Sequence, residues 1–299
     1  MTDSESPPSG IKSAPGPWLN LPVTTYMFSF WSSPPLLDHA YAPLEAASSC
    51  ADPKESGAFR GGVSLIEIVR YHDTPVGPYD ELAIVPGSFD VTVLESKGKK
   101  MKQMPRHNDT CWNGRHNWNI PKHLAKFSYS TDPKTSTLSV KVSAPDADAK
   151  PFFSVDLSMV RYLPSFPFST NIAKYFGVEM CMAQPPLPSG VKSPKLLRSD
   201  EDPTPLCGTS EWRFAIPEVW GKASLCWVNQ TVPSKQTPNS AGQTSDGAEA
   251  NETDRLLPQT DSENSGVGWP SYRPWPVGLW IEEGKINFQD AHVDGLKAK

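Results

Sequence analysis

Proline is spread through the whole chain, and it limits what this chain can fold into. The sequence of 299 residues contains 32 prolines. A proline inside a helix removes a hydrogen bond and costs about 3 kcal/mol, which argues against long helices. Many segments instead alternate apolar and polar residues with a period of two, as half-buried strands do. The sequence therefore predicts an all-β fold, β-rich with a few short helices.

The alternating segments divide the chain into a series of predicted strands. The segment GRHNWNIPKHLAKFSY mostly alternates as well, and it is assigned to a strand with the rest. One short helix is expected within 34–48. The expected strands cover 24–31, 61–73, 81–94 (one or two strands), 117–130, 136–144, 151–168 (one or two strands), 223–230 and 278–288. Antiparallel strands of this kind form a barrel or a sandwich.

Two segments have a composition typical of disorder. Residues 1–15 are acidic and rich in proline, and residues 233–266 are rich in Ser, Thr, Gly, Asn and Asp. Chains of this composition bury too little apolar surface to fold. Ordinary core strands lie on both sides of the second segment. The sequence therefore predicts one β domain over 16–299 with a disordered insertion at about 233–266, rather than two domains joined by a linker.

Charge and cysteine content narrow the classes of function. The formal net charge of −5 gives no reason to expect nucleic acid or an anionic membrane as a partner. No segment reaches the ~18 apolar residues of a membrane span, and the first residues lack the apolar core of a secretory signal. Five widely spaced cysteines without a CxxC pair favour free thiols in a reducing cytosol. The histidines show no metal-binding spacing, so no metal is expected. No other cofactor is expected either.

Three charged residues fall on faces that the alternation directs toward the interior. These are Glu67, Glu81 and Lys122, and their neighbours two residues away are apolar. Glu67 shares its face with Val63, Leu65, Val69 and Tyr71; Glu81 with Tyr79, Ala83 and Val85; Lys122 with Trp118, Ile120 and Leu124. Buried charges are costly and concentrate where chemistry happens, so the three favour a functional site. Structural salt bridges, or a shifted register, are the competing interpretation.

Two segments resemble the acetoacetate decarboxylase superfamily. In EIVRYHDTPVGPYDEL (67–82), a glutamate opens a strand that runs into a His-Asp-Thr turn, and a second glutamate follows a tyrosine, as in the family. In GRHNWNIPKHL (114–124), a Gly-Arg pair precedes Pro-Lys by the family's short fixed spacing. The likeness is greatest to fungal members described only as acetoacetate decarboxylase-like. It extends in order over about 16–230 and over the last strands.

This resemblance implies an antiparallel double-sheet barrel or cone, and a decarboxylase that works through a lysine iminium, or Schiff base. Lys122 matches the family's Schiff-base lysine, and Glu81 matches a carboxylate beside it that moves protons or orients the substrate. Glu67 is expected to position neighbouring groups. The implied substrate pocket contains Trp118, Ile120, Leu124, Tyr79, Arg115 and His123. Members of the family often form larger oligomers, so a homo-oligomer is an expectation, although the sequence reveals no interface.

Two positions depart from the family pattern. His123 stands where the decarboxylases usually carry a second lysine, and GPWLNLPVTTY (16–26) lacks their N-terminal arginine. The substrate is therefore expected to be a β-keto acid larger and more apolar than acetoacetate, such as a polyketide-derived acid of fungal secondary metabolism.

The proposed chemistry requires a neutral lysine. The ordinary pKa of a lysine is about 10.4, so reactivity at neutral pH requires a decrease of about three units, or roughly 4 kcal/mol. His123 adds little positive charge at pH 7. Desolvation by Trp118, Ile120 and Leu124 is therefore expected to lower the pKa of Lys122.

Two other functions fit the same residues. An iminium can also serve aldol condensation or dehydration, and relatives with this fold are known to catalyse such reactions. Alternatively, the barrel binds an apolar ketone or a lipid without catalysis, and Lys122 is only the charge partner of Glu81. Covalent trapping separates binding from catalysis, and CO₂ release separates decarboxylation from aldol chemistry.

Overall fold

A computed structural model describes residues 7, 10–36, 40–91, 99–100, 108–145, 150–172, 181–191, 205–230 and 272–291. The predicted insertion at 233–266 and residues 1–6 and 8–9 of the predicted tail lie outside these ranges. Within the tail, Lys12 and Ala14 hydrogen bond to Asn113 through main-chain atoms, each at 2.8 Å. None of the helices in the described ranges is long and apolar enough to cross a membrane.

Strands make up most of the described chain, and the helices are short. The first half contains β1 (Trp18–Ser32), α1 (Pro43–Ala46), the 3-10 turn η1 (Ser49–Ala51), α2 (Pro53–Ser56), β2 (Ala58–Tyr71), β3 (Tyr79–Val85), β4 (Ser88–Asp90), β5 (Lys99–Lys100) and α3 (Asn108–Trp118). The second half contains β6 (Lys126–Thr131), β7 (Leu138–Ser143), β8 (Pro151–Met159), β9 (Phe166–Ser169), β10 (Met182–Gln184), β11 (Gly190–Val191), β12 (Pro205–Leu206), β13 (Arg213–Ala215), β14 (Glu218–Gln230) and β15 (Val277–Phe288).

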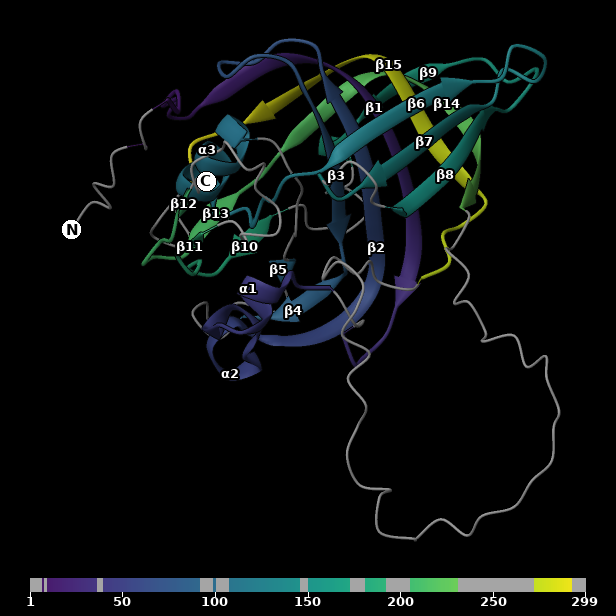
Figure 1. Cartoon of the computed structure of the whole chain (residues 1–299). Helices are drawn as coiled ribbons and strands as arrows, with labels where there is room; N and C mark the ends of the chain where they lie inside the picture. Colours follow the sequence, from purple (N-terminus) through teal and green to yellow (C-terminus); the bar gives the residue numbers. More distant parts are fainter. Residues whose placement is uncertain are drawn as a thin grey trace, which may run out of the picture.

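One large sheet organises these elements. Within the described ranges it has 13 strands in the order β13-β10-β5-β4-β2-β1-β15-β14-β8-β7-β6, with β3 also paired to β2 and β9 to β14. Neighbouring strands pair antiparallel, except for a short parallel contact between β5 and β10. The sheet curls into a nearly closed barrel, with α3 at one side and α1 and α2 beside β4 (Figure 1). The predicted all-β, antiparallel barrel is confirmed.

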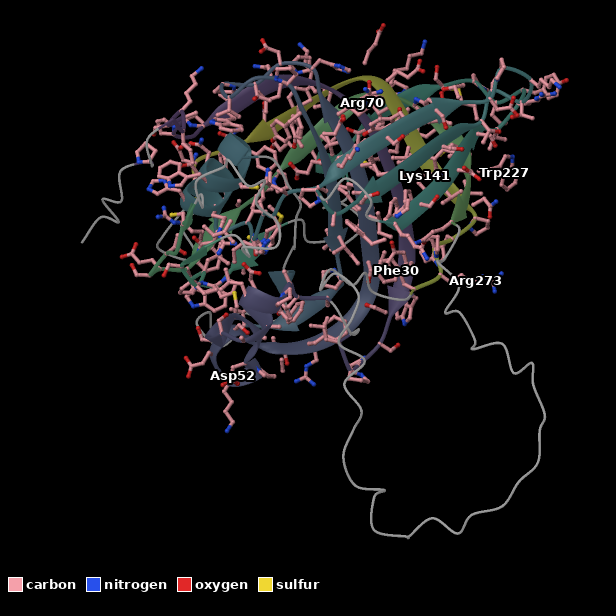
Figure 2. The ribbon with its side chains drawn as sticks, in the orientation of Figure 1. Phe30, Asp52, Arg70, Lys141, Trp227 and Arg273 are labelled. Atoms are coloured by element: carbon pink, nitrogen blue, oxygen red, sulfur yellow. The ribbon has the colours of Figure 1, made fainter. Side chains whose placement is uncertain are left out.

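Strand β2 joins two parts of this sheet by bending. Its later residues pair with β3 and its first residues with β4. Gly61 and Gly62 lie at the change of partner with φ of 74° and 109°, values that residues with a side chain rarely adopt. A Cβ on Gly61 would lie 2.5 Å from the carbonyl oxygen of Ser32. Asp52, before α2, and Arg70, near the end of β2, lie at opposite ends of the molecule (Figure 2).

Alternation directs the two faces of the central strands into different cores. Even-numbered residues of β1, β2 and β3 pack against β6, β7 and β8, in a core that includes Tyr26, Phe28, Ile66, Ile68, Leu82, Val140, Phe153 and Leu157. Odd-numbered residues face a second core, here called the inner core, which α3, β10 and β13 help to close. The inner core includes Val23, Met27, Val69, Tyr71, Tyr79, Ala83, Trp118, Ile120, Met182 and Ile281.

Most of the predicted elements are confirmed, and one is wrong. The alternating segments correspond to β1, β2, β3, β4, β7, β8, β9, β14 and β15, and the short helix expected within 34–48 is α1. The strand predicted over 117–130 does not exist as such. Helix α3 continues to Trp118, the next residues are irregular apart from a single bridge at Leu124, and β6 begins only at Lys126.

Helix α3 is defined by its end rather than by an apolar period. Asn119 terminates it in the left-handed conformation, with φ of 51°, which is common at helix C-termini. The N–H groups of Asn119 and Ile120 donate to the carbonyls of Arg115 at 3.0 Å and Gly114 at 3.1 Å. Pro121 cannot continue a helix. The strand prediction used only side-chain alternation and therefore misread a segment whose backbone follows these local bonds.

Candidate active site

Lys122 lies at the centre of the candidate site. Its Nζ lies 2.8 Å from Oε2 of Glu81, and the two side chains are 4% and 1% exposed. The same nitrogen lies 5.1 Å from the centroid of the Tyr79 ring, at a distance where a cation is attracted to the ring face. The structure thus brings together an amine, a carboxylate and an aromatic ring that the sequence analysis had selected.

Strands β2 and β3 position the two carboxylates. Glu81 lies opposite Val69, and Glu67 lies opposite Ala83. Diagonal neighbours on paired strands are about 7–8 Å apart, so Glu67 and Glu81 are close without being directly opposite. Both are buried, at 3% and 1% exposure. The prediction that both point toward an apolar interior is confirmed, and their catalytic roles stay predictions.

A tight turn directs Lys122 inward. Its N–H donates to the carbonyl of Ile120 at 2.7 Å, which closes a three-residue turn around Pro121. Beyond this turn, Lys122 and His123 bond to different carboxylates, since Nε2 of His123 lies 2.8 Å from Oε2 of Glu45. His123 was assigned to the substrate pocket, and the structure places it in a neighbouring ion-pair network instead of beside the amine.

Gly114 on α3 leaves room for the Lys122 side chain. A Cβ on Gly114 would lie 2.7 Å from Cδ and 2.8 Å from Cε of Lys122. The lysine methylenes therefore pass so close to α3 that only a glycine fits at position 114. This contact gives a physical reason for the spacing between the Gly-Arg and Pro-Lys pairs in the sequence.

Substitution of Gly114→Ala is expected to displace Lys122 from Glu81. The added methyl cannot fit beside the lysine stem, and a misplacement of about 1 Å at a reacting group can reduce turnover by roughly 100-fold. Helix stability should change little or increase, because alanine favours helices over glycine by about 1 kcal/mol. Turnover and thermal melting test this together. Unchanged turnover in a folded Gly114→Ala variant would contradict the placement of the lysine stem.

Two opposing effects act on the pKa of Lys122. Burial is the largest single effect and lowers it by disfavouring the charged amine, whereas the charge of Glu81, the charge of Tyr79 and the hydrogen bond to Glu81 together raise it, so that the pKa lies above the ordinary range. The expectation that apolar neighbours would lower this pKa is therefore wrong for the paired state. Desolvation acts in the expected direction, but the neighbouring groups, led by Glu81, together outweigh it.

The aromatic and aliphatic residues predicted for the pocket have different positions. Ile120 and Trp118 belong to the inner core, at 1% and 2% exposure. Trp118 packs edge-on against Trp18, with centroids 5.2 Å apart, and its Nε1 donates to the carbonyl of Gln289 at 2.8 Å. Leu124 is only partly buried. Trp118 and Ile120 therefore line the interior, and Leu124 contributes less to it than the alternation implied.

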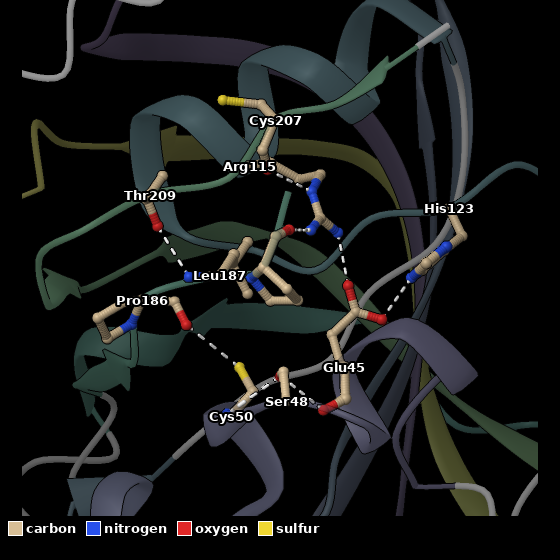
Figure 3. Close-up of polar contacts among 10 residues, drawn as sticks. Glu45, Ser48, Cys50, Arg115, His123, Pro186, Leu187, Cys207 and Thr209 are labelled. Carbon is tan, nitrogen blue, oxygen red and sulfur yellow. Dashed lines mark hydrogen bonds and ion pairs between the residues drawn. The ribbon is translucent and has the colours of Figure 1, made fainter. Parts of the chain in front are cut away.

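A second group of buried charges, here called the Glu45 network, joins α1, α3 and the turn after Lys122. Oε1 of Glu45 lies 2.7 Å from Nη1 of Arg115, and both side chains are 0% exposed. Arg115 also donates to the carbonyls of Cys207 at 2.8 Å and Pro188 at 2.7 Å. Figure 3 shows Glu45 between Arg115 and His123. Arg115 was predicted to line the substrate pocket, and the structure directs its guanidinium to these protein groups.

Sequence reasoning missed Glu45. Burial raises its pKa, but the hydrogen bond and charge of His123 and the charge of Arg115 outweigh burial, so that the pKa lies below its ordinary value of 4.5. The only signal was an acidic residue, one of two in 34–48, within a largely apolar segment. Because Arg115 and His123 are close in sequence to Lys122, the network helps to position the lysine.

The other potential reactive groups form no cluster. Among the described residues, no three His, Cys, Asp or Glu side chains lie close enough together to hold a metal ion. No disulfide bond joins the five cysteines, Cys50, Cys111, Cys181, Cys207 and Cys226, which all lie in the described ranges. Burial, and then the charge of Glu45, raises the pKa of Cys50 to about 12, which leaves it a poor nucleophile.

Comparison with solved structures identifies the architecture. An acetoacetate decarboxylase from Legionella pneumophila is similar over 98% of this chain and 94% of that chain, with a TM-score of 0.54 and 14% identity. The chain has the acetoacetate decarboxylase fold. Another acetoacetate decarboxylase structure is similar at 13% identity, over 96% of this chain and 92% of that one, with a TM-score of 0.47.

A third similar structure is the enduracididine biosynthesis enzyme MppR in complex with the condensation product of pyruvate and imidazole 4-carboxaldehyde. It has a TM-score of 0.49 and 9% identity over 97% of this chain and 98% of that one. No family model and no curated protein sequence matches the chain. The acetoacetate decarboxylase fold is therefore established by structure alone.

Proposed function

We propose that the chain is a carbon–carbon lyase that decarboxylates a β-keto acid through an iminium on Lys122. The observation that carries this proposal is the buried pair of Lys122 and Glu81, 2.8 Å apart, inside the acetoacetate decarboxylase fold. Burial of an amine beside a proton acceptor is what nucleophilic catalysis by lysine requires. The pairing itself would also suit a structural ion pair, so a covalent test is decisive.

The first step is a proton transfer within the pair. Lys122 is protonated in the paired state, and only the neutral amine attacks a ketone. Transfer of one proton to Glu81 converts two buried charges into an amine and a carboxylic acid, and it moves no net charge out of the apolar interior. Glu81 therefore acts as the base that produces the neutral amine, a step that desolvation of Lys122 alone does not supply.

The carbon–carbon bond breaks after the iminium has formed. The amine adds to the ketone, Glu81 returns its proton to the departing hydroxyl, and water leaves an iminium cation beside a carboxylate. The C–C bond to the carboxylate then breaks, CO₂ leaves, and the electron pair moves to the iminium nitrogen to give an enamine. Protonation of the enamine carbon and hydrolysis release the ketone and restore Lys122. Glu67, on the same face, orients these groups.

The substrate is a β-keto acid larger than acetoacetate, in this proposal one derived from a polyketide in fungal secondary metabolism. The apolar inner core around the pair supports a substrate with a carbon tail, through Val69, Trp118, Ile120 and Ile281. Five cysteines without a disulfide bond support a reducing compartment such as the cytosol. The similarity of fold supports the reaction class. The substrate class is inferred from the apolar residues around the pair.

Borohydride trapping tests the proposal. With a β-keto acid or its ketone product, reduction should leave a stable adduct on Lys122, which peptide mass spectrometry can locate. Lys126, four residues away and exposed, is an internal control that should stay unmodified. Lys122→Arg keeps a positive charge opposite Glu81 but should abolish the adduct and CO₂ release. Adducts confined to surface lysines would favour the non-catalytic ketone-binding barrel, and an adduct without CO₂ release would favour aldol or dehydratase chemistry.

A further inference from the structure

Several buried polar atoms have no hydrogen-bond partner within the part of the chain that the structure describes, and three of them lie on strands β1, β2 and β10 around the inner core. These three are Oγ1 of Thr25, the hydroxyl of Tyr71 and Nε2 of Gln184. The three residues are 0%, 3% and 1% exposed. Buried polar groups in folded proteins nearly always have a partner, because an unsatisfied group keeps the full desolvation penalty. Unpartnered atoms of this kind point to a ligand where they share one interior.

The strand register places two of them on the face of the lysine–glutamate pair. Thr25 lies opposite Val69, which lies opposite Glu81 on the next strand. Thr25 is therefore in the same cross-strand row as Glu81, two strands away, or roughly 10 Å. Tyr71 faces the same side and stacks on Tyr79, with ring centroids 4.3 Å apart. Tyr71 thus adjoins the ring that the lysine cation faces, and Thr25 lies on the next strand of the same face.

Gln184 approaches the same interior from β10. Met182 belongs to the inner core, whereas Ala183 belongs to another cluster. Because side chains alternate along a strand, Gln184 faces the same side as Met182. Its main-chain carbonyl accepts a hydrogen bond from Nδ2 of Asn119 at 3.3 Å, and Asn119 immediately precedes the turn that carries Lys122. The amide therefore lies on the strand that flanks this turn.

The chemistry of the three groups selects a class of ligand. Hydroxyls donate and accept hydrogen bonds, and Nε2 of Gln184 only donates. Burial, the charge of Glu81 and the contact with Tyr79 raise the pKa of Tyr71 well above its ordinary range, so its hydroxyl stays neutral. None of the three groups carries a positive charge, and the nearby Glu67 and Glu81 disfavour another anion. A neutral ketone or hydroxyl oxygen suits them better than a second carboxylate.

We propose that Thr25, Tyr71 and Gln184 form a second binding site for the substrate, which takes a neutral ketone or hydroxyl oxygen several carbons away from the ketone that Lys122 attacks. This inference rests on the proposed function and narrows its substrate class to keto acids that are oxygenated along the tail. Apolar residues such as Val69 contact the carbon chain between the two oxygen functions.

Stability of ligand-free variants gives the first test. Thr25→Val and Tyr71→Phe remove a hydroxyl with little change in volume, and Gln184→Met removes the amide. Because Oγ1 of Thr25 and Nε2 of Gln184 have no partner, the variants at these two positions should melt at the same temperature as the wild type or higher, while ligand binding weakens. Tyr71→Phe loses only the contact of its hydroxyl with Tyr79 and should melt at most slightly lower. Thr24→Val is a matched control, since Oγ1 of Thr24 bonds to His72 and to the Glu282 carbonyl outside the inner core.

Binding gives the second test. Calorimetry is carried out with two ketones of equal chain length, one with a plain alkyl tail and one with a hydroxyl in the tail. The wild type should bind the hydroxylated ketone roughly tenfold more tightly. Thr25→Val and Tyr71→Phe should remove most of this preference and keep the affinity for the alkyl ketone. The affinities of the Lys122→Met variant for the two ketones are measured as well. This variant cannot form an iminium, so its preference reports on non-covalent binding alone.

The outcomes separate this inference from the proposed function. Equal affinity of the wild type for the two ketones, or an unchanged preference in Tyr71→Phe, would overturn the second binding site. A large decrease in the melting temperature of the ligand-free variants would also overturn it, because it would show that the hydroxyls have structural partners. Failure of the proposed function is distinct: borohydride leaves no adduct at Lys122 with either ketone, while the preference for the hydroxylated ketone persists.

Discussion

Glu81→Gln is expected to reduce CO₂ release by about 100- to 10,000-fold, the usual contribution of a positioned acid or base. The same substitution should lower the pKa of Lys122. In the wild type, burial is the largest single effect on this pKa and lowers it, while Glu81 is the main group that raises it, so removal of the carboxylate leaves burial as the dominant effect. The pKa should then fall below its ordinary value of about 10.4.

The two effects of Glu81→Gln have different signatures. Borohydride trapping depends on the neutral amine, so its acid limb should move to lower pH in the variant, although CO₂ release is slow. Asp80→Asn is a matched control, because Asp80 is the neighbouring residue on the opposite face of β3 and pairs with Arg70 at 3.2 Å. It should leave both measurements nearly unchanged. An identical pH profile for trapping in Glu81→Gln and in the wild type would show that Glu81 does not set the charge of Lys122.

Period-two alternation predicted the part of the site that strands carry. Glu67 and Glu81 lie on regular strands, where a side chain's face follows from its position alone. Their burial could therefore be predicted without knowledge of the tertiary structure. The same reasoning failed at 117–130, because the backbone there follows the end of α3 and the turn at Pro121. Asn119 followed by Pro121 was the available signal, since both are common just after a helix.

Trp118, Ile120 and Lys122 were nevertheless predicted to share a face, and all three are buried. The agreement arises from the helix end and the tight turn, not from an extended strand. The prediction also placed Leu124 on this face, and Leu124 is only partly buried.

The remaining features depend on contacts between distant segments, which one sequence does not reveal. Glu45 lies 70 residues from Arg115 along the chain, yet their side chains are in contact. The charge of Lys122 depends in the same way on Glu81, 41 residues earlier. Local surroundings alone suggested a lowered pKa for the lysine. Its long-range partner reverses the sign of the effect.

Glu45→Ala is expected to be the most destabilising substitution in the Glu45 network. It leaves the fully buried guanidinium of Arg115 without its carboxylate, and breaking a buried pair by removal of one partner typically costs about 3–5 kcal/mol. This is a large part of the roughly 5–15 kcal/mol by which domains are stable. Chemical denaturation should show the loss as a lower midpoint with an unchanged slope. Turnover should decrease as well, because His123 loses the anchor that holds the turn next to Lys122.

The dependence on pH distinguishes the charge of Glu45 from its packing. The folded-state pKa of Glu45 is below 4.5, so its stabilisation is present above that pH and is lost as the pH falls through the folded pKa. The difference in stability between wild type and Glu45→Ala should therefore be largest near neutral pH and decrease in acid.

Two controls test whether the ion pair, rather than its site, accounts for the loss. Asp90→Asn breaks the ion pair between Asp90 and Arg60. The side chain of Asp90 is 48% exposed and that of Arg60 is 63% exposed. This substitution should hardly change stability, since exposed pairs contribute little. Joint replacement of Glu45 and Arg115 by methionine removes both charges, and it should restore part of the stability that Glu45→Ala loses. If Glu45→Ala were as stable as the wild type, the network would not hold α1 against α3, and the anchoring of Lys122 through His123 would have to be abandoned.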